Sequence, residues 1–350
     1  MRFDLQMLVI FCKLNFVMAE GQIYKIHSDF YYVQKDNQTF ECKIREVLKK
    51  QQLKIVVGDF VEFDGGVISK ILPKKTFIPR PSVANVDQIV VVSALKAPDL
   101  DFHQLNRYIS LAKYYKIPVV LCFNKEDLGL DEDAQDKILS IYGALGYEIV
   151  FTSALEKKGI DAFRKLLSGK VSALCGNSGV GKSSLINALN PNVNLRTKEV
   201  SEKLNRGTHT TRHCEIIALD ETSAIVDTPG FSNVRFDFML PQDVDTLFPE
   251  MHKYSGYCKY GDCLHINEDG CEVLKHVEEI DETRYESYVE FVSEAIEYKE
   301  KIKYNGVKKE TAQKFKNNKA QVKISEKKRQ ASRNTRKQMI YKELDNDADE

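Results

Sequence analysis

The chain has 350 residues, more than one ordinary domain, so two or three domains are expected. Its 51 basic and 51 acidic residues cancel, which excludes a uniformly basic or acidic protein, yet residues 299–337 hold fifteen Lys or Arg against three Glu, and residues 343–350 are acidic. No apolar run approaches the roughly 20 residues of a membrane helix, so we expect a soluble, cytoplasmic protein without a membrane partner.

The first segment, residues 1–18, contains a short apolar run at residues 8–12. Few basic residues precede this run and no Ala-x-Ala site follows it, so a secretory signal peptide is only the alternative interpretation. We interpret the segment as a leader or start-site extension, with Met18 as the real start. Isolated cysteines occur in five apolar runs and are predicted to be buried, reduced thiols of a cytosolic protein: Cys12, Cys42, Cys122, Cys175 and Cys214.

Residues 19–73 consist of short alternating runs separated by turn residues, a pattern typical of a small β-barrel. The predicted strands cover residues 22–26, 30–33, 39–43, 59–63 and 66–71. A barrel of this size is predicted to be an oligonucleotide-binding (OB) type. A purely structural β domain remains the alternative.

Residues 74–240 alternate between apolar strand-like runs and amphipathic segments, which predicts an α/β domain. The predicted strands are residues 88–93, 118–123, 148–151, 170–175, 214–219 and 223–226, and the predicted helices are residues 101–116 and 182–189.

The stretch from Gly176 to Ser183 matches the phosphate-binding loop pattern between a predicted strand and helix. Its glycines let backbone N–H groups surround a phosphate at the helix N-terminus. Lys182 can reach the β- and γ-phosphates, and Ser183 can bind Mg²⁺. A chance glycine-rich turn is the alternative. The predicted GTP contacts are Gly176, Asn177, Ser178, Gly179, Val180, Gly181, Lys182, Ser183 and Ser184.

An Asp-x-x-Gly motif follows the predicted strand that ends at Val226. Asp227 can hold the magnesium through water, and the N–H group of Gly230 can sense the γ-phosphate. Such a turn is common by itself, but its place after the phosphate-binding loop supports a nucleotide site.

A guanine-selecting motif follows the predicted strand that ends at Phe123. Asp127 can accept both the N1 and N2 protons of guanine, and adenine offers no such pair, so the motif favours GTP over ATP. A surface charge cluster is the alternative. The predicted contacts are Asn124, Lys125, Glu126 and Asp127, with Thr152, Ser153 and Ala154 after the next strand near the guanine oxygen.

The guanine-selecting motif precedes the phosphate-binding loop, the reverse of their order in ordinary GTP-binding proteins. All these loops follow strands, and the carboxyl ends of parallel strands share one edge of a sheet. The order therefore predicts a circularly permuted GTPase. It also places the segment from His209 to Phe231 shortly before the cysteine cluster, which suggests coupling between the two.

Residues 241–304 hold a cysteine and histidine cluster and then a long charged helix, predicted over residues 281–304. Three thiolates and one imidazole satisfy a tetrahedral structural Zn²⁺ and leave no open position for catalysis. The predicted ligands are Cys258, Cys263, His265 and Cys271. His252 and His276 are competing imidazoles, and free thiols in a loop are the alternative to a metal site.

The last segment, residues 305–350, is basic and then acidic, with few large apolar side chains, and is predicted to be disordered when free. Lys and Arg in residues 299–337 can neutralise RNA phosphates in a salt-sensitive way. A solvated charged face is the alternative.

The loop order, residues 207–212, residues 227–231 and the cysteine cluster together resemble the bacterial ribosome small-subunit-dependent GTPase A (RsgA, YjeQ) family. The resemblance covers nearly everything from Met18 to Tyr304. It implies an OB barrel, a permuted GTPase domain and a zinc domain. It further implies a monomer that binds the 30S subunit and its 16S rRNA late in assembly, with stimulated GTP hydrolysis and release afterwards.

By this resemblance, Thr210 or Thr211 is the switch threonine that closes on magnesium and the γ-phosphate. The family usually has Arg at Thr208 and Gly at Asn205, so the fine geometry of the switch departs from the pattern. The water-orienting Gln of many GTPases is Phe231 here, and His209 resembles the family's proposed catalytic histidine.

Three alternatives stay open at this stage. His209 can be a solvated loop residue or a ribosome contact. The protein can be a permuted GTPase acting on the large subunit. It can also be an RNA-binding assembly chaperone whose nucleotide pocket no longer turns over.

Overall fold

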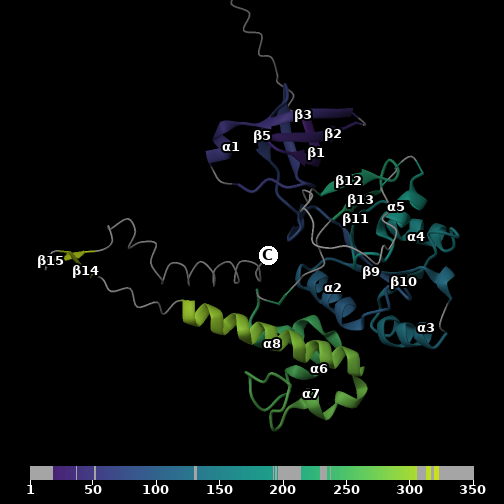
Figure 1. Ribbon diagram of the computed structural model, residues 1–350, viewed down its shortest axis with the longest axis vertical. Helices are drawn as coiled ribbons and strands as arrows, with labels where there is room; N and C mark the ends of the chain where they lie inside the picture. Colours follow the sequence, from purple (N-terminus) through teal and green to yellow (C-terminus); the bar gives the residue numbers. More distant parts are fainter. Residues whose placement is uncertain are drawn as a thin grey trace, which may run out of the picture. The chain divides into compact units, whose positions relative to one another are not determined.

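The computed structural model describes residues 19–36, 38–50, 53–129, 132–191, 193, 195, 214–228, 235, 236, 238–305, 313–316 and 319–322. The chain forms two compact units, and each combines segments that are distant in sequence (Figure 1). The first unit comprises residues 1–92 and 152–231, and the second comprises residues 93–151 and 232–350.

The first unit begins with the predicted barrel. Its strands are β1 (Ala19–His27), β2 (Phe30–Lys35), β3 (Gln38–Ile44), β4 (Phe60–Asp64) and β5 (Val67–Ile71), with α1 (Glu46–Lys50) between β3 and β4. Antiparallel pairing of β1 with β4 closes the barrel, and β3 pairs with β5 in parallel. Alternate side chains such as Ile23, Val33 and Val61 are fully buried inside, as the alternating sequence predicts.

The first unit also holds a parallel sheet. Strands β8 (Gln88–Ala94), β11 (Val171–Cys175) and β13 (Ala224–Asp227) pair in parallel in the order β8, β11, β13. Strand β12 (Glu215–Ala218) runs antiparallel to β13 and also pairs with β1 of the barrel, where Lys25 and Glu215 form an ion pair of 3.1 Å. Helices α4 (Ile160–Leu167) and α5 (Lys182–Leu189) and the hairpin of β6 (Phe77–Pro79) and β7 (Ser82–Ala84) complete the unit.

The second unit contains the parallel pair β9 (Val119–Asn124) and β10 (Glu148–Phe151). Its helices near these strands are α2 (Phe102–Tyr114), η1 (Glu126–Leu128), α3 (Glu132–Ile138) and η2 (Leu139–Gly143). The side chain of Asp101 accepts a hydrogen bond from the Gln104 N–H at 3.0 Å and caps α2, so this helix begins where the sequence predicts.

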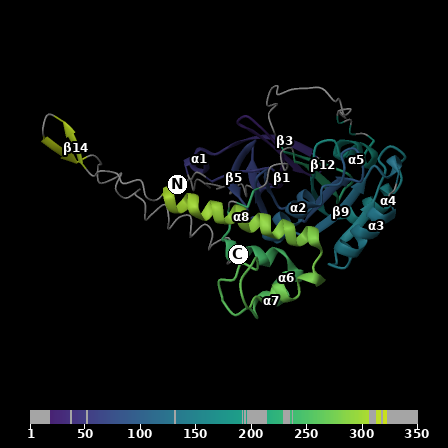
Figure 2. The same ribbon diagram turned by 60° about the horizontal axis from the view of Figure 1, so that its bottom comes forward.

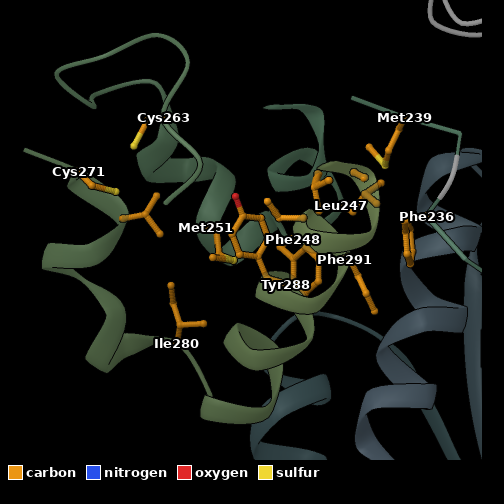
Figure 3. Packing of buried hydrophobic residues seen from close by; sticks show 14 residues of the cluster. Phe236, Met239, Leu247, Phe248, Met251, Cys263, Cys271, Ile280, Tyr288 and Phe291 are labelled. Carbon is orange, nitrogen blue, oxygen red and sulfur yellow. The ribbon is translucent and has the colours of Figure 1, made fainter. Parts of the chain in front are cut away.

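The helical part of the second unit follows residue 240. It consists of η3 (Pro241–Leu247), α6 (Pro249–Ser255), α7 (Glu272–Lys275), η4 (Val277–Glu279) and α8 (Glu282–Asn305). Both ribbon views place α6 and α7 beside α8 (Figure 2). Aromatic and aliphatic side chains form their shared core, where the rings of Phe236 and Phe291 stack with centroids 4.2 Å apart (Figure 3).

The long helix α8 packs on α2 through buried polar groups as well as apolar ones. Arg107 of α2 binds Glu290 at 2.7 Å and Glu294 at 2.8 Å, and Arg284 of α8 donates to Asn106 at 3.1 Å. The hydroxyl of Tyr142 donates to the same Asn106 oxygen at 2.8 Å. This network joins the helical region to the helix that precedes β9.

The predicted strands and helices of the α/β domain are present within a few residues of their expected bounds. In the tail, β14 (Gln313–Lys316) and β15 (Lys319–Val322) pair as an antiparallel hairpin that the sequence patterns do not predict. The remaining tail residues and residues 1–18 lie outside the described part of the chain. Among the helices that the structure describes, none combines the length and apolar character needed to cross a membrane.

Candidate nucleotide and metal sites

The phosphate-binding loop connects β11 to α5, and its backbone requires glycine. Gly176, Gly179 and Gly181 all have positive φ, at 141°, 84° and 94°. A Cβ atom on Gly176 would lie 2.0 Å from the carbonyl oxygen of Val92, so no other residue fits there. The glycines of the sequence therefore determine the geometry of this loop.

The side chain of Lys182 folds back over this loop. Its Nζ donates to the carbonyl oxygens of Gly176 and Asn177, both at 2.8 Å. Burial lowers the pKa of Lys182, and the negative charge of Asp227 opposes that shift. The ammonium is thus held at the loop in a setting where anionic phosphate oxygens would stabilise its charge.

Asp227 ends β13 next to the strand that leads into the loop. Its register partner is Leu174, one residue before the end of β11. Burial raises the pKa of Asp227, and Lys182 opposes the rise. The Thr228 hydroxyl donates to the Leu174 carbonyl at 2.5 Å, which ties the start of the Asp-x-x-Gly turn to the same strand. The structure therefore brings the phosphate-binding loop and Asp227 together, as predicted.

The guanine-selecting motif lies in the second unit, at the end of β9. Asn124 is buried and its carbonyl accepts from the Leu95 N–H at 3.4 Å. Lys125 adopts a left-handed backbone with φ of 66°, and its Nζ donates to the Ala97 carbonyl. Glu126 and Asp127 begin the turn η1.

Of the remaining predicted contacts, the residues after β10 are described by the structure and the switch residues are not. Thr152 and Ser153 are fully buried directly after β10, where the Ser153 hydroxyl accepts from the Glu156 N–H at 3.0 Å. They are counted with the first unit, and the guanine-selecting motif with the second. The predicted switch residues lie outside the described residues: His209, Thr210, Thr211 and Gly230.

The predicted metal ligands converge in the second unit. The ligand atoms of Cys258, Cys263, His265 and Cys271 all lie within 4.8 Å of one another. Individual separations are 3.4 Å from His265 Nδ1 to Cys271 Sγ and 3.9 Å between the sulfurs of Cys258 and Cys271. A tetrahedral centre with metal–sulfur bonds near 2.3 Å needs ligand separations of about 3.8 Å. This cluster could hold a metal ion.

The chemistry of the ligand set also fits a metal. Burial lowers the pKa of His265, which favours the neutral imidazole that binds metals. Burial raises the pKa of Cys263 to about 12, so the thiol keeps its proton unless a cation replaces it. The competing imidazoles bind carboxylates: His252 Nδ1 lies 2.9 Å from Asp245, and His276 Nδ1 lies 2.8 Å from Glu279.

Neighbouring residues that the sequence patterns missed hold the metal loop, residues 258–271. Tyr285 and Tyr288 of α8 donate to the carbonyls of His265 at 3.0 Å and Leu264 at 2.8 Å. Burial raises the pKa of Glu268, but backbone N–H donors, including those of residues 264, 266 and 267, lower it overall. The only available sequence signal was the three-residue spacing of the two tyrosines on a predicted helix. Figure 3 shows Cys263 and Cys271 at the margin of the helical core.

Comparison with family models agrees with this architecture. A model described as RsgA GTPase matches residues 71–237, and one described as RsgA N-terminal domain matches residues 20–67. A model described as 50S ribosome-binding GTPase matches residues 171–309.

Relatives and solved structures extend the match over most of the chain. The small ribosomal subunit biogenesis GTPase RsgA of Alkaliphilus metalliredigens is 38% identical over 286 residues, covering 79% of this chain and 98% of that protein. The protein of the same name from Clostridium botulinum strain 657 is 40% identical over 291 residues, covering 81% and 99%. The crystal structure of YjeQ from Thermotoga maritima matches with a TM-score of 0.68 at 34% identity, covering 79% and 98%. YloQ, described as a circularly permuted GTPase, matches with a TM-score of 0.66 at 31% identity, covering 81% and 97%.

Proposed function

Because the chain belongs to the RsgA family of small ribosomal subunit biogenesis GTPases, we propose that it hydrolyses GTP to GDP and phosphate and acts in late assembly of the 30S subunit. The observation that carries the proposal is the phosphate-binding loop, in which glycine-only backbone geometry holds the Lys182 ammonium beside Asp227. Such a loop binds the phosphates of a nucleotide through backbone N–H groups and one ammonium.

Guanine selection is assigned to the second unit. Asp127 accepts the N1 and N2 protons of guanine, while Asn124 and Lys125 contact the base and its loop, with Glu126 completing the motif. The buried Asn124 and the left-handed turn at Lys125 support this role, because they fix the backbone from which Asp127 projects. Thr152, Ser153 and Ala154 contribute contacts to the guanine oxygen.

Hydrolysis then requires an oriented water and stabilised charge at the γ-phosphate. Lys182 and the loop N–H groups neutralise phosphate oxygens, the Gly230 N–H binds the γ-phosphate, and His209 orients the attacking water. Mg²⁺ would be held by Ser183 and by Thr210 or Thr211, with Asp227 acting through water. When bound, this ion would offset the negative charge of the phosphates.

The metal loop is assigned one structural Zn²⁺, because Cys258, Cys263, His265 and Cys271 fill a tetrahedral shell. This domain, the barrel and the basic residues 299–337 contact 16S rRNA. The protein acts as a cytoplasmic monomer that binds the 30S subunit in its GTP state and leaves after hydrolysis.

The deciding experiment measures GTP hydrolysis by the full chain with and without purified 30S subunits, with 50S subunits as the control. We expect 30S subunits to stimulate turnover, 50S subunits to have no effect, and Lys182→Ala to abolish nucleotide binding. His209→Ala should keep GTP affinity and lose the stimulated turnover. Absence of turnover under all conditions would favour an RNA-binding chaperone instead.

A large-subunit GTPase is the second candidate, because the family model for 50S ribosome-binding GTPases matches residues 171–309. The relatives that match nearly their whole length are named for the small subunit, which favours the 30S assignment. Stimulation by 50S subunits alone would reverse this choice.

A further inference from the structure

Three charged residues lie side by side on neighbouring strands of the first unit. Lys25 of β1 is the register partner of Glu215 of β12, and Glu215 is the register partner of Asp227 of β13. Register partners on antiparallel strands have Cβ atoms about 5 Å apart and point to the same face of the sheet. This charged row (Lys25, Glu215 and Asp227) therefore extends from the barrel to the carboxylate beside the phosphate-binding loop.

The first pair of the charged row is an ion pair. The Lys25 Nζ donates to the two carboxylate oxygens of Glu215, at 3.1 and 3.2 Å. Within the described part of the chain, Lys25 is the basic side chain that Glu215 binds. The two side chains are 39% and 42% exposed, so the pair should add little to folding stability. A role for the pair therefore depends on the charge that Lys25 neutralises.

Asp227 is sensitive to the charge of Glu215. Burial raises the pKa of Asp227, the Lys182 ammonium opposes this rise, and the Glu215 carboxylate adds to it. Lys182 and Glu215 thus act on Asp227 with opposite sign. Their balance matters for ligand binding, because Lys182 and Asp227 both belong to the proposed nucleotide site.

The other titratable groups beside Lys25 belong to the barrel. Tyr32 of β2 is its register partner on the opposite side from β12, and Glu41 of β3 is the register partner of Tyr32. Burial and Glu41 raise the pKa of Tyr32, and Lys25 opposes the rise. Of the two carboxylates, Lys25 forms its ion pair with Glu215, so the loss of Lys25 would mainly free the charge of Glu215.

A bound nucleotide would bring several negative charges to the same region. The phosphate-binding loop follows β11, and β11 pairs with β13, which ends at Asp227. A carboxylate about 10 Å from the phosphates repels them unless a cation neutralises it, because Coulomb interactions at that distance are still appreciable in a protein. The ammonium of Lys25 is the described cation in position to do so.

We propose that Lys25, a residue of the barrel, is a positioning residue of the nucleotide site that acts through Glu215. By neutralising this carboxylate, Lys25 raises the affinity of the phosphate-binding loop for anionic nucleotide. The inference rests on the proposed function, since it requires a guanine nucleotide at that loop. It makes the barrel a part of the electrostatics of nucleotide binding.

The test measures binding of a fluorescent GDP analogue to the full-length protein with saturating Mg²⁺ at low salt. Lys25→Met should weaken binding by about twofold to tenfold, the range for one unit charge about 10 Å away. Glu215→Gln should strengthen binding by a similar factor, because it removes the carboxylate and leaves Lys25. The double variant should return to the affinity of the wild type, and Lys25→Arg should keep that affinity because the charge remains.

A second barrel ion pair supplies the matched control. Lys70 binds Glu62 at 2.6 Å, and neither residue belongs to the charged row. Lys70→Met should leave nucleotide affinity unchanged, although it also removes a lysine of the barrel that is paired with a carboxylate. Raising the salt concentration to about 0.5 M should reduce the effects of the Lys25 and Glu215 variants, because salt screens partly exposed charges.

The sign of the two single variants decides between charge and mere contact. If the pair only attached the barrel to β12, Lys25→Met and Glu215→Gln would weaken binding equally, and that result would overturn the proposal. Unchanged affinity in both variants would also overturn it, while the proposed function would stand as long as the wild type binds the nucleotide. A wild type that binds no guanine nucleotide would overturn both.

Discussion

The phosphate-binding loop and the metal loop are both short connections before a helix, but they are held in opposite ways. Residues 176–181 depend on positive-φ glycines and on a close backbone approach to Val92. Residues 258–271 form no helix or strand, and four of their side chains converge on one point. A loop specified by its backbone forms before its ligand arrives, whereas a loop specified by ligand side chains depends on the ion that joins them.

Metal removal should have the largest effect, because it tests whether only the metal loop depends on an ion. Cys258→Ser, or chelation of the wild type, should release the metal loop, because structural zinc supplies about 10 kcal/mol in small zinc-finger peptides. Hydrogen exchange should rise greatly in residues 258–271 and stay unchanged in residues 176–181. Cys258 is the best ligand to change, since Cys263 and Cys271 also belong to the helical core.

Metal analysis by mass spectrometry and a Cys42→Ser variant in the barrel are the controls. The barrel variant should keep its metal, because Cys42 is buried among apolar side chains far along the chain from the ligands. Equal loss of protection in both loops would show that the phosphate-binding loop also depends on the ion.

The buried ion pair of Arg284 offers a way to weaken α8, whose Tyr285 and Tyr288 donate hydrogen bonds to the metal loop. Arg284 is 1% exposed and its Nε donates to Glu250 at 2.6 Å. Arg284→Met leaves that carboxylate buried without its partner and should lower the free energy of unfolding by about 3–5 kcal/mol, measured by urea denaturation. Adding Glu250→Gln should recover part of the lost free energy of unfolding. No recovery would mean that Arg284 stabilises the helical region by packing against Phe248 rather than by its charge.

Both loops could be predicted from local sequence patterns. Glycine spacing predicted the loop from Gly176 to Lys182, and the cysteine pattern predicted the four side chains that converge in the metal loop, because each pattern reflects a local requirement of backbone or coordination. The barrel strands were predicted for the same reason, since alternation is local.

Long-range partners were not predictable in this way. Asn106 meets Arg284 across 178 positions and Tyr142 across 36. The local sequence around each of these residues is typical of an ordinary helix. Only the packing of α2 on α8 brings them together as a network. The sequence suggested coupling of the switch to the metal domain through the chain between them. The switch residues lie outside the described part of the chain, so that coupling stays a prediction. The described contacts connect the metal domain to α2, the helix before β9.

A change to Gly176 tests whether glycine geometry specifies the phosphate-binding loop. Gly176→Ala combines a φ of 141° with a Cβ 2.0 Å from the Val92 carbonyl, so it should cost at least about 3 kcal/mol of stability and abolish nucleotide binding. Gly169→Ala is the matched control, because its φ is 71° and nothing lies within 4 Å of an added Cβ. It should cost about 1 kcal/mol and leave nucleotide binding intact. Equal losses in thermal unfolding would show that strain alone, without the close approach, accounts for the glycine.

The smallest expected effect concerns the charge of Lys182. Burial lowers its pKa from the ordinary 10.5, so the unfolded chain keeps this proton to higher pH than the folded one does. Stability therefore rises with pH in the window below 10.5, where the unfolded state binds more protons. Lys182→Met removes this contribution, and urea denaturation across the window should show the wild type gaining stability relative to the variant as pH rises. A constant difference would mean that the loop carbonyls of Gly176 and Asn177 compensate the buried charge, leaving the ammonium as stable at the loop as in water.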